Sequence, residues 1–190
     1  MDKATNYIVT YLINNHIIKE TEAPIYQYGA SILFIKIGYL ISFLLLGLIF
    51  DVFTETVIFL LIYSPIRIYA GGYHAPTILK CYILSLITVI INGIICVNYT
   101  LFESYFVDEI AFILSLIYIY IYCPVDNNNK RLDEFEKHKF KKYTSIILSV
   151  YIIIFIVLFL NPLILSKYRV MVEYIVFIEF LMMFLELSNG

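Results

Sequence analysis

Long apolar runs separated by short polar segments dominate the chain between residues 31 and 187. Residues 82–102, 110–125 and 143–166 contain no charged side chain, and 170–187 is apolar apart from three glutamates. A helix needs roughly 20 apolar residues to cross a bilayer core about 30 Å thick. The pattern therefore predicts six transmembrane helices, over residues 31–50, 52–69, 78–101, 108–124, 143–165 and 170–187.

The character of these runs favours helices over transmembrane β-strands. Strands of a membrane barrel alternate apolar and polar residues, whereas Ile146–Leu160 is apolar on every side. We expect an all-α polytopic membrane protein with about six transmembrane helices. It forms one integral-membrane domain over residues 1–190, with the six-helix bundle over residues 31–187.

The first 25 residues predict a different kind of helix. Apolar residues recur at helical spacing over residues 4–12, while Asn6 and Thr10 interrupt any apolar run. An amphipathic helix over residues 1–25 lies in the membrane interface or packs on the bundle. The sequence leaves these two alternatives open.

The composition excludes several classes of protein. Hydrophobic residues make up 62% and charged residues 15% of the 190 residues, against about 45–50% and about 25% in soluble domains. These values exclude an ordinary soluble domain and a disordered chain. Three cysteines are too few for a disulfide scaffold, and a net charge of −2 gives no sign of nucleic-acid binding.

The positions of Lys and Arg predict the orientation, because cytoplasmic loops carry an excess of these residues. Lys167 and Arg169 fall on one predicted side, and Lys36 lies within the first helix. Ten basic residues fall on the other side: Lys3, Lys19, Arg67, Lys80, Lys130, Arg131, Lys137, Lys139, Lys141 and Lys142. Both termini and the expected loops 69–78 and 124–142 are therefore predicted to lie in the cytoplasm.

One polar segment between predicted helices holds residue types suited to catalysis. His74 and Cys81 form the minimum pair for thiolate chemistry, in which the imidazole takes the thiol proton and the thiolate attacks a carbonyl carbon. The amides of Gly71 and Gly72 can donate to an oxyanion. Arg67 supplies a positive charge suited to a carboxylate of a peptide substrate.

The spacing of this pair sets a condition on the fold. On one continuous helix, residues seven positions apart lie about 10.5 Å apart along the axis, which is too far for a hydrogen bond. Pro76 suits the first position of the next helix, which puts His74 before that helix and Cys81 about a turn and a half inside it. The glycine pair permits positive φ and lets the chain fold back, and the helix N-terminus favours the thiolate.

Simpler interpretations of the same residue types stay open. A cysteine in a membrane helix is most often a packing residue; this is our interpretation of Cys96 and Cys123, and it is the alternative for Cys81. One His and one Cys do not make a zinc site, so we expect no metal ion and no cofactor. His16 and His138 are flanked by polar residues and are interpreted as surface histidines.

A second polar segment, over residues 123–142, carries six basic residues, among them Lys130 and Arg131. They set the membrane topology, attract an acidic peptide or bind anionic lipid headgroups. Lys130 and Arg131 are the candidates for peptide binding. Ionisable residues inside a span are functional candidates by default, but Glu179 has no partner evident from the sequence.

Five residues of the first polar segment stand at a characteristic spacing: Arg67, Gly71, Gly72, His74 and Cys81. With the length of the chain, its predicted spans and its Pro-Val-Asp…Asn-Lys segment, they resemble the accessory gene regulator protein B family over nearly the whole chain. The resemblance implies a membrane cysteine endopeptidase of bacterial quorum sensing. Its implied substrate is a pheromone precursor peptide with an amphipathic leader and an acidic tail.

The resemblance also implies a mechanism. His74 is the general base, and Cys81 is the nucleophile that releases the tail and forms a thioester acyl-enzyme. An internal Cys or Ser of the peptide then closes a thiolactone or lactone. Arg67 and Gly72 match positions that the family needs for activity, whereas Lys130-Arg131 stands where the family often has Lys-Pro. A homodimer in the bacterial cell membrane, active at its cytoplasmic face, is expected; a peptide exporter or channel subunit without proteolytic activity is the alternative.

Overall fold

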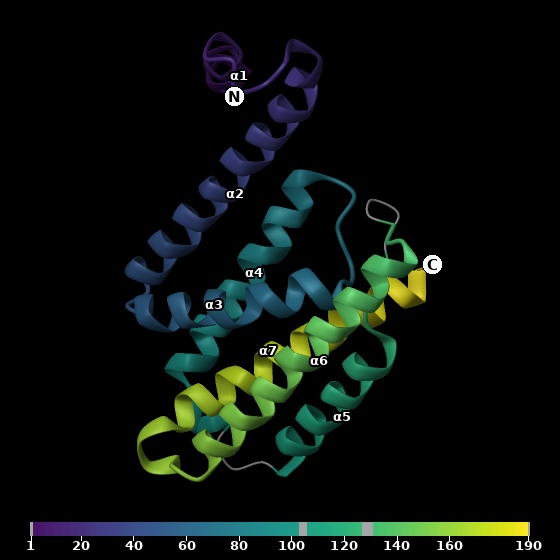
Figure 1. Ribbon diagram of the computed structural model, residues 1–190. Coiled ribbons are helices and arrows are strands. Elements are labelled where there is room, and N and C mark those ends of the chain that lie inside the picture. Colours follow the sequence, from purple (N-terminus) through teal and green to yellow (C-terminus); the bar gives the residue numbers. More distant parts are fainter. Residues whose placement is uncertain (1, 103–105, 127–130, 190) are drawn as a thin grey trace. The chain divides into compact units, whose positions relative to one another are not determined.

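Helices dominate the structure. The computed structural model describes residues 2–102, 106–126 and 131–189, which contain seven α-helices and two short 3₁₀ helices (Figure 1). The α-helices are α1 (Asp2–Asn14), α2 (Ala23–Ile49), α3 (Phe53–Ala70), α4 (Ile78–Val97), α5 (Phe106–Tyr122), α6 (Glu134–Phe159) and α7 (Pro162–Asn189). The 3₁₀ helices are η1 (Glu20–Glu22) and η2 (Tyr99–Leu101). The predicted all-α fold is confirmed.

Close contacts group the chain into two compact units, Met1–Leu45 and Leu46–Gly190. In the first unit, α1 has both buried and exposed side chains. Val9 is buried, whereas Tyr7 and Tyr11 are exposed. The residues that the pattern places on the apolar face of this helix, among them Tyr7 and Tyr11, are therefore exposed within the first unit and not buried. The arrangement of the whole chain as one domain stays a prediction.

The second unit is built around α7, which packs against α3, α4, α5 and α6 (Figure 1). Met171, Ile175 and Met183 of α7 are fully buried, and so are Phe59 of α3 and Ile119 of α5. Between helices in lipid there is no hydrophobic driving force, so van der Waals packing and internal polar contacts hold them together. Because α7 packs against all four of these helices, it contacts the elements that carry the candidate site residues.

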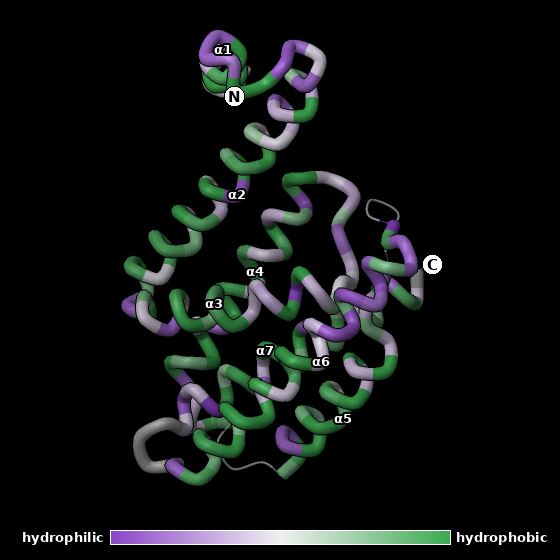
Figure 2. Tube along the Cα trace, in the orientation of Figure 1, coloured by the Kyte–Doolittle hydropathy of each residue, from purple (hydrophilic) through white to green (hydrophobic). Residues whose placement is uncertain are grey.

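Apolar residues line much of the length of the helices (Figure 2). Many of their side chains are exposed, for example those of Leu61 on α3 and Ile153 on α6. Among the described residues, four helical segments are long and apolar enough to cross a membrane: Glu20–Ile49, Phe53–Ala70, Ile78–Val97 and Glu134–Phe159. Helix α5 has only 17 residues, and α7 carries several charged residues along its 28. The protein thus has helices suited to a membrane, but the predicted count of six spans is not confirmed.

Several helix boundaries differ from those predicted. Helix α6 ends at Phe159 and α7 begins at Pro162, so the predicted break between residues 165 and 170 is wrong and Lys167 and Arg169 lie within α7; a proline suits the first position of a helix.

Helix α2 begins at Ala23, before the predicted start at residue 31. Helix α6 begins at Glu134, so the expected loop 124–142 is wrong in its second half. Asp133 accepts a hydrogen bond from the Glu136 N–H at 2.7 Å, and Glu136 accepts one from the Asp133 N–H at 3.2 Å. This capping box starts the helix within a stretch whose charge suggested a loop.

Candidate active site

The connection between α3 and α4 begins with two glycines in conformations that other residues avoid. Gly71 has a φ of +85° and Gly72 a φ of +109°, angles that glycine adopts without strain. Space is also restricted, because a Cβ on Gly71 would lie 2.2 Å from the carbonyl oxygen of Val125. The prediction that this pair uses positive φ is confirmed.

Hydrogen bonds hold the connection to α3 and α7. Arg67 of α3 donates from Nη1 to the carbonyl oxygen of Gly71 at 2.6 Å, and from Nη2 to that of Tyr73. The N–H of Tyr73 donates to the carbonyl oxygen of Met182 on α7 at 2.8 Å. Both backbone polar groups of Tyr73, its N–H and its carbonyl oxygen, are therefore held by hydrogen bonds. Sequence reasoning missed Met182, because it acts through a backbone atom that carries no residue-specific signal.

A buried carboxylate faces Arg67. Nη1 of Arg67 lies 3.8 Å from Oε1 of Glu179 on α7, and the Glu179 side chain is fully buried while that of Arg67 is 18% exposed. The described contacts of Arg67 are thus with the protein itself, and its binding of a substrate carboxylate stays a prediction. The packing of α7 against α3 supplies the partner of Glu179 that the sequence did not show.

Cys81 lies in the first turn of α4. Thr77 caps the helix: its hydroxyl accepts from the Lys80 N–H at 3.2 Å, and its carbonyl oxygen accepts from the Cys81 N–H at 3.0 Å. The prediction that Pro76 begins the helix is wrong, because the Thr77 hydroxyl satisfies a terminal N–H that would otherwise lack a partner. Cys81 is closer to the N-terminus than predicted, where the positive end of the helix dipole favours a thiolate.

The three cysteines differ in accessibility. All are free thiols, and Cys81 is half-buried, whereas Cys96 and Cys123 are only 3% and 5% exposed. Burial raises the pKa of the Cys123 thiol, which disfavours the reactive thiolate. The interpretation of Cys96 and Cys123 as packing residues is confirmed, and Cys81 is the cysteine most open to a substrate.

His74 lies on the connection beside the anchored Tyr73, and its side chain is exposed. Tyr63 of α3, which the sequence pattern did not single out, interacts electrostatically with Cys81 and Glu179. The arrangement combines an exposed imidazole, a partly accessible thiol at a helix N-terminus and a connection whose backbone is hydrogen-bonded to α7.

The segment that follows α5 packs against the same connection. The N–H of Val125 donates to the carbonyl oxygen of Ala70 at 2.8 Å, and Gly71 forms an isolated backbone bridge with Val125. Nζ of Lys141 on α6 donates to carbonyl oxygens at the end of α5, including that of Ile121 at 3.1 Å. The two polar segments that the sequence singled out are therefore brought together.

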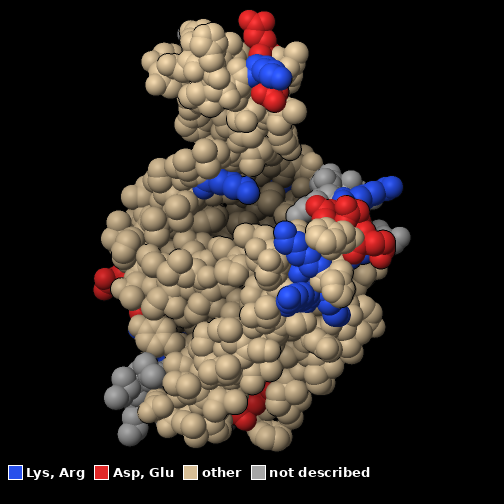
Figure 3. Space-filling model, viewed as in Figure 1, with Lys and Arg blue, Asp and Glu red and all other residues tan. Residues whose placement is uncertain are grey.

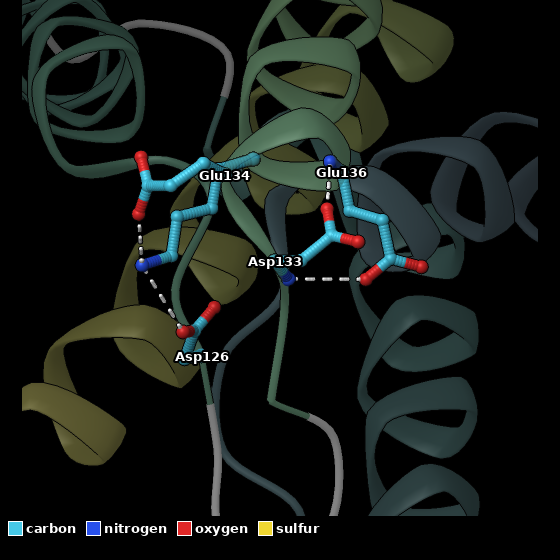
Figure 4. A network of polar contacts seen from close by, with 5 residues as sticks. Asp126, Asp133, Glu134 and Glu136 are labelled. Atoms are coloured by element: carbon cyan, nitrogen blue, oxygen red, sulfur yellow. Dashed lines mark hydrogen bonds and ion pairs between the residues drawn. The ribbon is translucent and has the colours of Figure 1, made fainter.

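Lys and Arg side chains gather around the N-terminal part of α6 (Figure 3). Lys137 lies between two carboxylates, 3.7 Å from Asp126 and 3.3 Å from Glu134, next to the capping box of the same helix (Figure 4). These contacts hold the segment after α5 against the start of α6. Lys137, like Lys141, is thus already engaged within the protein.

Other basic residues of this region are exposed. Arg131, Lys139 and Lys142 are exposed and form no ion pair with any part of the chain that the structure describes. Lys130, a predicted peptide-binding residue, lies outside the described residues. The exposed basic residues described in this region are therefore Arg131 and two lysines on α6.

Over residues 2–102, 106–126 and 131–189, no group of three His, Cys, Asp or Glu side chains is arranged to hold a metal ion. The expectation of no metal and no cofactor stays a prediction.

Comparison with known proteins gives a family for the chain. Residues 5–186 match the family described as accessory gene regulator B. AgrB-like protein 2 of Clostridium perfringens strain 13 is 30% identical over 141 residues, which cover 68% of this chain and 64% of that protein. An AgrB-like protein of Clostridium perfringens strain SM101 is 33% identical over the same shares. Accessory gene regulator protein B of Staphylococcus aureus strain Newman is 28% identical over 85% of this chain and 84% of its own. No solved structure matches the chain.

Proposed function

Because this chain belongs to the accessory gene regulator B family, we propose that it is a membrane cysteine endopeptidase that processes the precursor peptide of a quorum-sensing signal. The observation that carries the proposal is the place of Cys81. It is a half-buried free thiol in the first turn of α4, directly after an anchored connection that presents His74. A positive helix end and access favour a thiolate nucleophile, and the proposal adds that His74 reaches the thiol as its base.

The proposed reaction has two acyl transfers. His74 accepts the proton of Cys81, and the Sγ thiolate attacks the carbonyl carbon at the end of the future ring. The tetrahedral intermediate collapses, the C–N bond breaks, and the imidazolium protonates the departing amine of the tail. The product on the protein is a Cys81 thioester. An internal thiol or hydroxyl of the peptide then attacks this thioester, closing a thiolactone or lactone and returning the thiol of Cys81.

The developing oxyanion needs a positive electrostatic environment. Gly71 and Gly72 are the donors that the sequence suggests, and Gly71 lies in a backbone bridge with Val125. The N-terminal end of α4 adds a second source of partial positive charge, which acts on the thiolate and on the oxyanion alike. Both contributions depend on the connection keeping its place beside the first turn of α4.

The direction of the reaction follows from its products. A thiolactone has nearly the free energy of the acyl-enzyme thioester, so ring closure by exchange is close to balanced. Departure of the tail makes the first step effectively one-way. Apolar surroundings also limit access of water to the acyl-enzyme, so that the internal nucleophile of the peptide competes successfully with hydrolysis.

The proposed substrate carries an amphipathic leader and an acidic tail. Arg131, Lys139 and Lys142 are exposed before and along the N-terminal part of α6, and positive charges there attract a negative tail. Lys130 completes the proposed set. The leader binds at the membrane interface, as amphipathic helices do.

We place the protein in the bacterial cell membrane with six spans, both termini in the cytoplasm and the active site at the cytoplasmic face. The excess of Lys and Arg on one side supports this orientation. The charges in α7 are compatible with a span, since Glu173 and Glu179 are buried and each faces an arginine. A homodimer is also proposed, since the short bundle leaves apolar faces exposed.

The proposal is tested by expressing the protein in membranes together with a tagged precursor. Wild-type protein should release the acidic tail, whereas Cys81→Ala and His74→Ala should not. Cys96→Ala and Cys123→Ala are the matched controls and should retain cleavage, because both thiols are buried packing groups. Cleavage by the Cys81→Ala variant would contradict the proposed nucleophile, and vectorial peptide movement in sealed vesicles that survives this substitution would favour an exporter.

A further inference from the structure

The buried carboxylate of Glu179 takes no direct part in the reaction proposed above. The Glu179 side chain is fully buried, and neither of its oxygens accepts a hydrogen bond from any described residue. A buried charge without full hydrogen bonding is unfavourable, and an apolar residue would pack a helix interface at lower cost. Packing alone therefore does not explain why a glutamate stands at position 179.

Arg67 connects this carboxylate to the backbone of the connection. Nη1 of Arg67 lies 3.8 Å from Glu179 and donates to Gly71 at 2.6 Å, while Nη2 donates to Tyr73. A guanidinium group is planar and rigid. A carboxylate that restrains one nitrogen therefore also restrains the direction in which the other nitrogen points. Without it, the guanidinium is free to turn away from the two carbonyl oxygens.

Helix α7 holds the connection at a second point. Met182 accepts the hydrogen bond of the Tyr73 N–H at 2.8 Å. Residues three apart on a helix lie on the same face, so Glu179 and Met182 act on the connection from one face of α7. Both backbone polar groups around Tyr73 are thus committed to an arrangement that α7 determines, and His74 is the next residue.

We propose that Glu179 is a positioning residue: through Arg67, it holds residues 71–77 in the conformation in which His74 activates Cys81. This inference rests on the proposed function, in which these two residues act as a pair. Glu179 touches neither the substrate nor the reacting atoms. Its contribution is to the rate of thiolate formation and acylation, and not to substrate affinity.

The test measures alkylation of Cys81 by iodoacetamide at pH 7, in a background in which Cys96 and Cys123 are alanine. In the otherwise unmodified protein, Cys81 should react about tenfold or more faster than in the His74→Ala variant. Glu179→Gln should lose most of this His74-dependent enhancement, and Glu179→Asp should retain part of it. The same substitutions should lower kcat for precursor cleavage and leave KM unchanged within about twofold.

Glu173→Gln is the matched control. Glu173 is another buried glutamate of α7, and its Oε1 lies 3.9 Å from Nε of Arg169. Its removal disturbs a buried ion pair on the same helix without touching the connection, so alkylation of Cys81 should stay within about twofold of the reference. An equal decrease of the alkylation rate in both variants would mean that any disturbance of α7 slows the reaction of Cys81. That result would overturn the specific role of Glu179.

Hydrogen exchange of residues 71–77 separates this inference from the proposed function. Glu179→Gln should raise the exchange rate of the Tyr73 N–H about tenfold or more, whereas Glu173→Gln should not. Unchanged exchange or unchanged alkylation in Glu179→Gln overturns the role of Glu179. If alkylation of the reference protein does not depend on His74, the catalytic pair of the proposed function fails, and the role of Glu179 in activation fails with it.

Discussion

A Cβ atom at position 72 would lie 2.7 Å from Nη1 of Arg67. The same atom would lie 3.1 Å from the backbone of Met182, and the φ of +109° strains any residue other than glycine. Gly72 thus lets a guanidinium group and helix α7 approach the backbone of the connection at the same point. The close approach depends on the missing side chain as much as on the flexibility of glycine.

Substitution of Gly72 by alanine should therefore impair both the fold and the reaction. We expect Gly72→Ala to lower the free energy of unfolding by about 1–3 kcal/mol and to reduce precursor cleavage about tenfold or more, because Arg67 is displaced. Thermal unfolding and cleavage in membranes measure the two effects. Gly38→Ala on α2 is the control, since nothing lies within 4 Å of a Cβ there, and equal effects at both positions would contradict the argument.

The cysteines should differ in their reaction with thiol reagents. Burial raises the pKa of the Cys123 thiol, so at neutral pH a smaller fraction is thiolate than in an ordinary cysteine, and labelling accelerates only as the pH approaches the raised value. A variant with Cys81 alone should be alkylated about tenfold or more faster at pH 7 than one with Cys123 alone. The difference should disappear in denaturant. Equal rates in the folded proteins would contradict the assigned environments.

Lys141 and Lys142 are neighbours with different expected roles. Lys141 donates to carbonyl oxygens at the end of α5, and a cation at a helix C-terminus is stabilising. Lys141→Met should lower the free energy of unfolding by about 1–2 kcal/mol, seen as a lower Tm in detergent. Lys142→Met is the control and should leave the Tm nearly unchanged, because Lys142 is exposed and has no ion-pair partner in the described chain. A larger decrease in Tm for Lys142→Met than for Lys141→Met would contradict the stabilising role of Lys141.

The exposed lysines should instead affect substrate binding. Replacing Lys139 and Lys142 by glutamine should raise KM for a precursor with an acidic tail about threefold or more, with little change in kcat. Added salt should weaken binding to the unmodified protein more than to this double variant, since it screens charge. A precursor with an uncharged tail serves as the control, and an equal rise in its KM would exclude a purely electrostatic role.

The sequence pattern was sufficient for the helical class and for the positive φ of Gly71 and Gly72, because both follow from local properties of the chain. The start of α6 was also visible as an Asp-x-x-Glu capping signature at Asp133 and Glu136, but the neighbouring charges suggested a loop. Thr77 is a similar signal at the start of α4, but Pro76 next to it also suits a helix N-terminus. In both cases, a side chain that satisfies a helix-end N–H decides the boundary.

The contacts of Arg67, unlike these helix boundaries, could not be predicted from local sequence. Its interaction with Glu179 joins α3 to α7, and no periodicity or motif states which helices will be neighbours. The anchor at Met182 is a carbonyl oxygen, which every residue possesses. The sequence therefore pointed to an arginine of the candidate site, but the identity of its partners depends on tertiary packing.

The same contacts impose an order on biosynthesis. Arg67, Gly72 and Cys81 are translated before α7, yet the acceptor for Tyr73 and the carboxylate facing Arg67 are both on α7. A nascent chain that has inserted only α3 to α6 carries its thiol without the support for the connection beside it. The reactive arrangement is thus completed at a late stage of assembly, and an unfinished protein holds its nucleophile in an unsupported state.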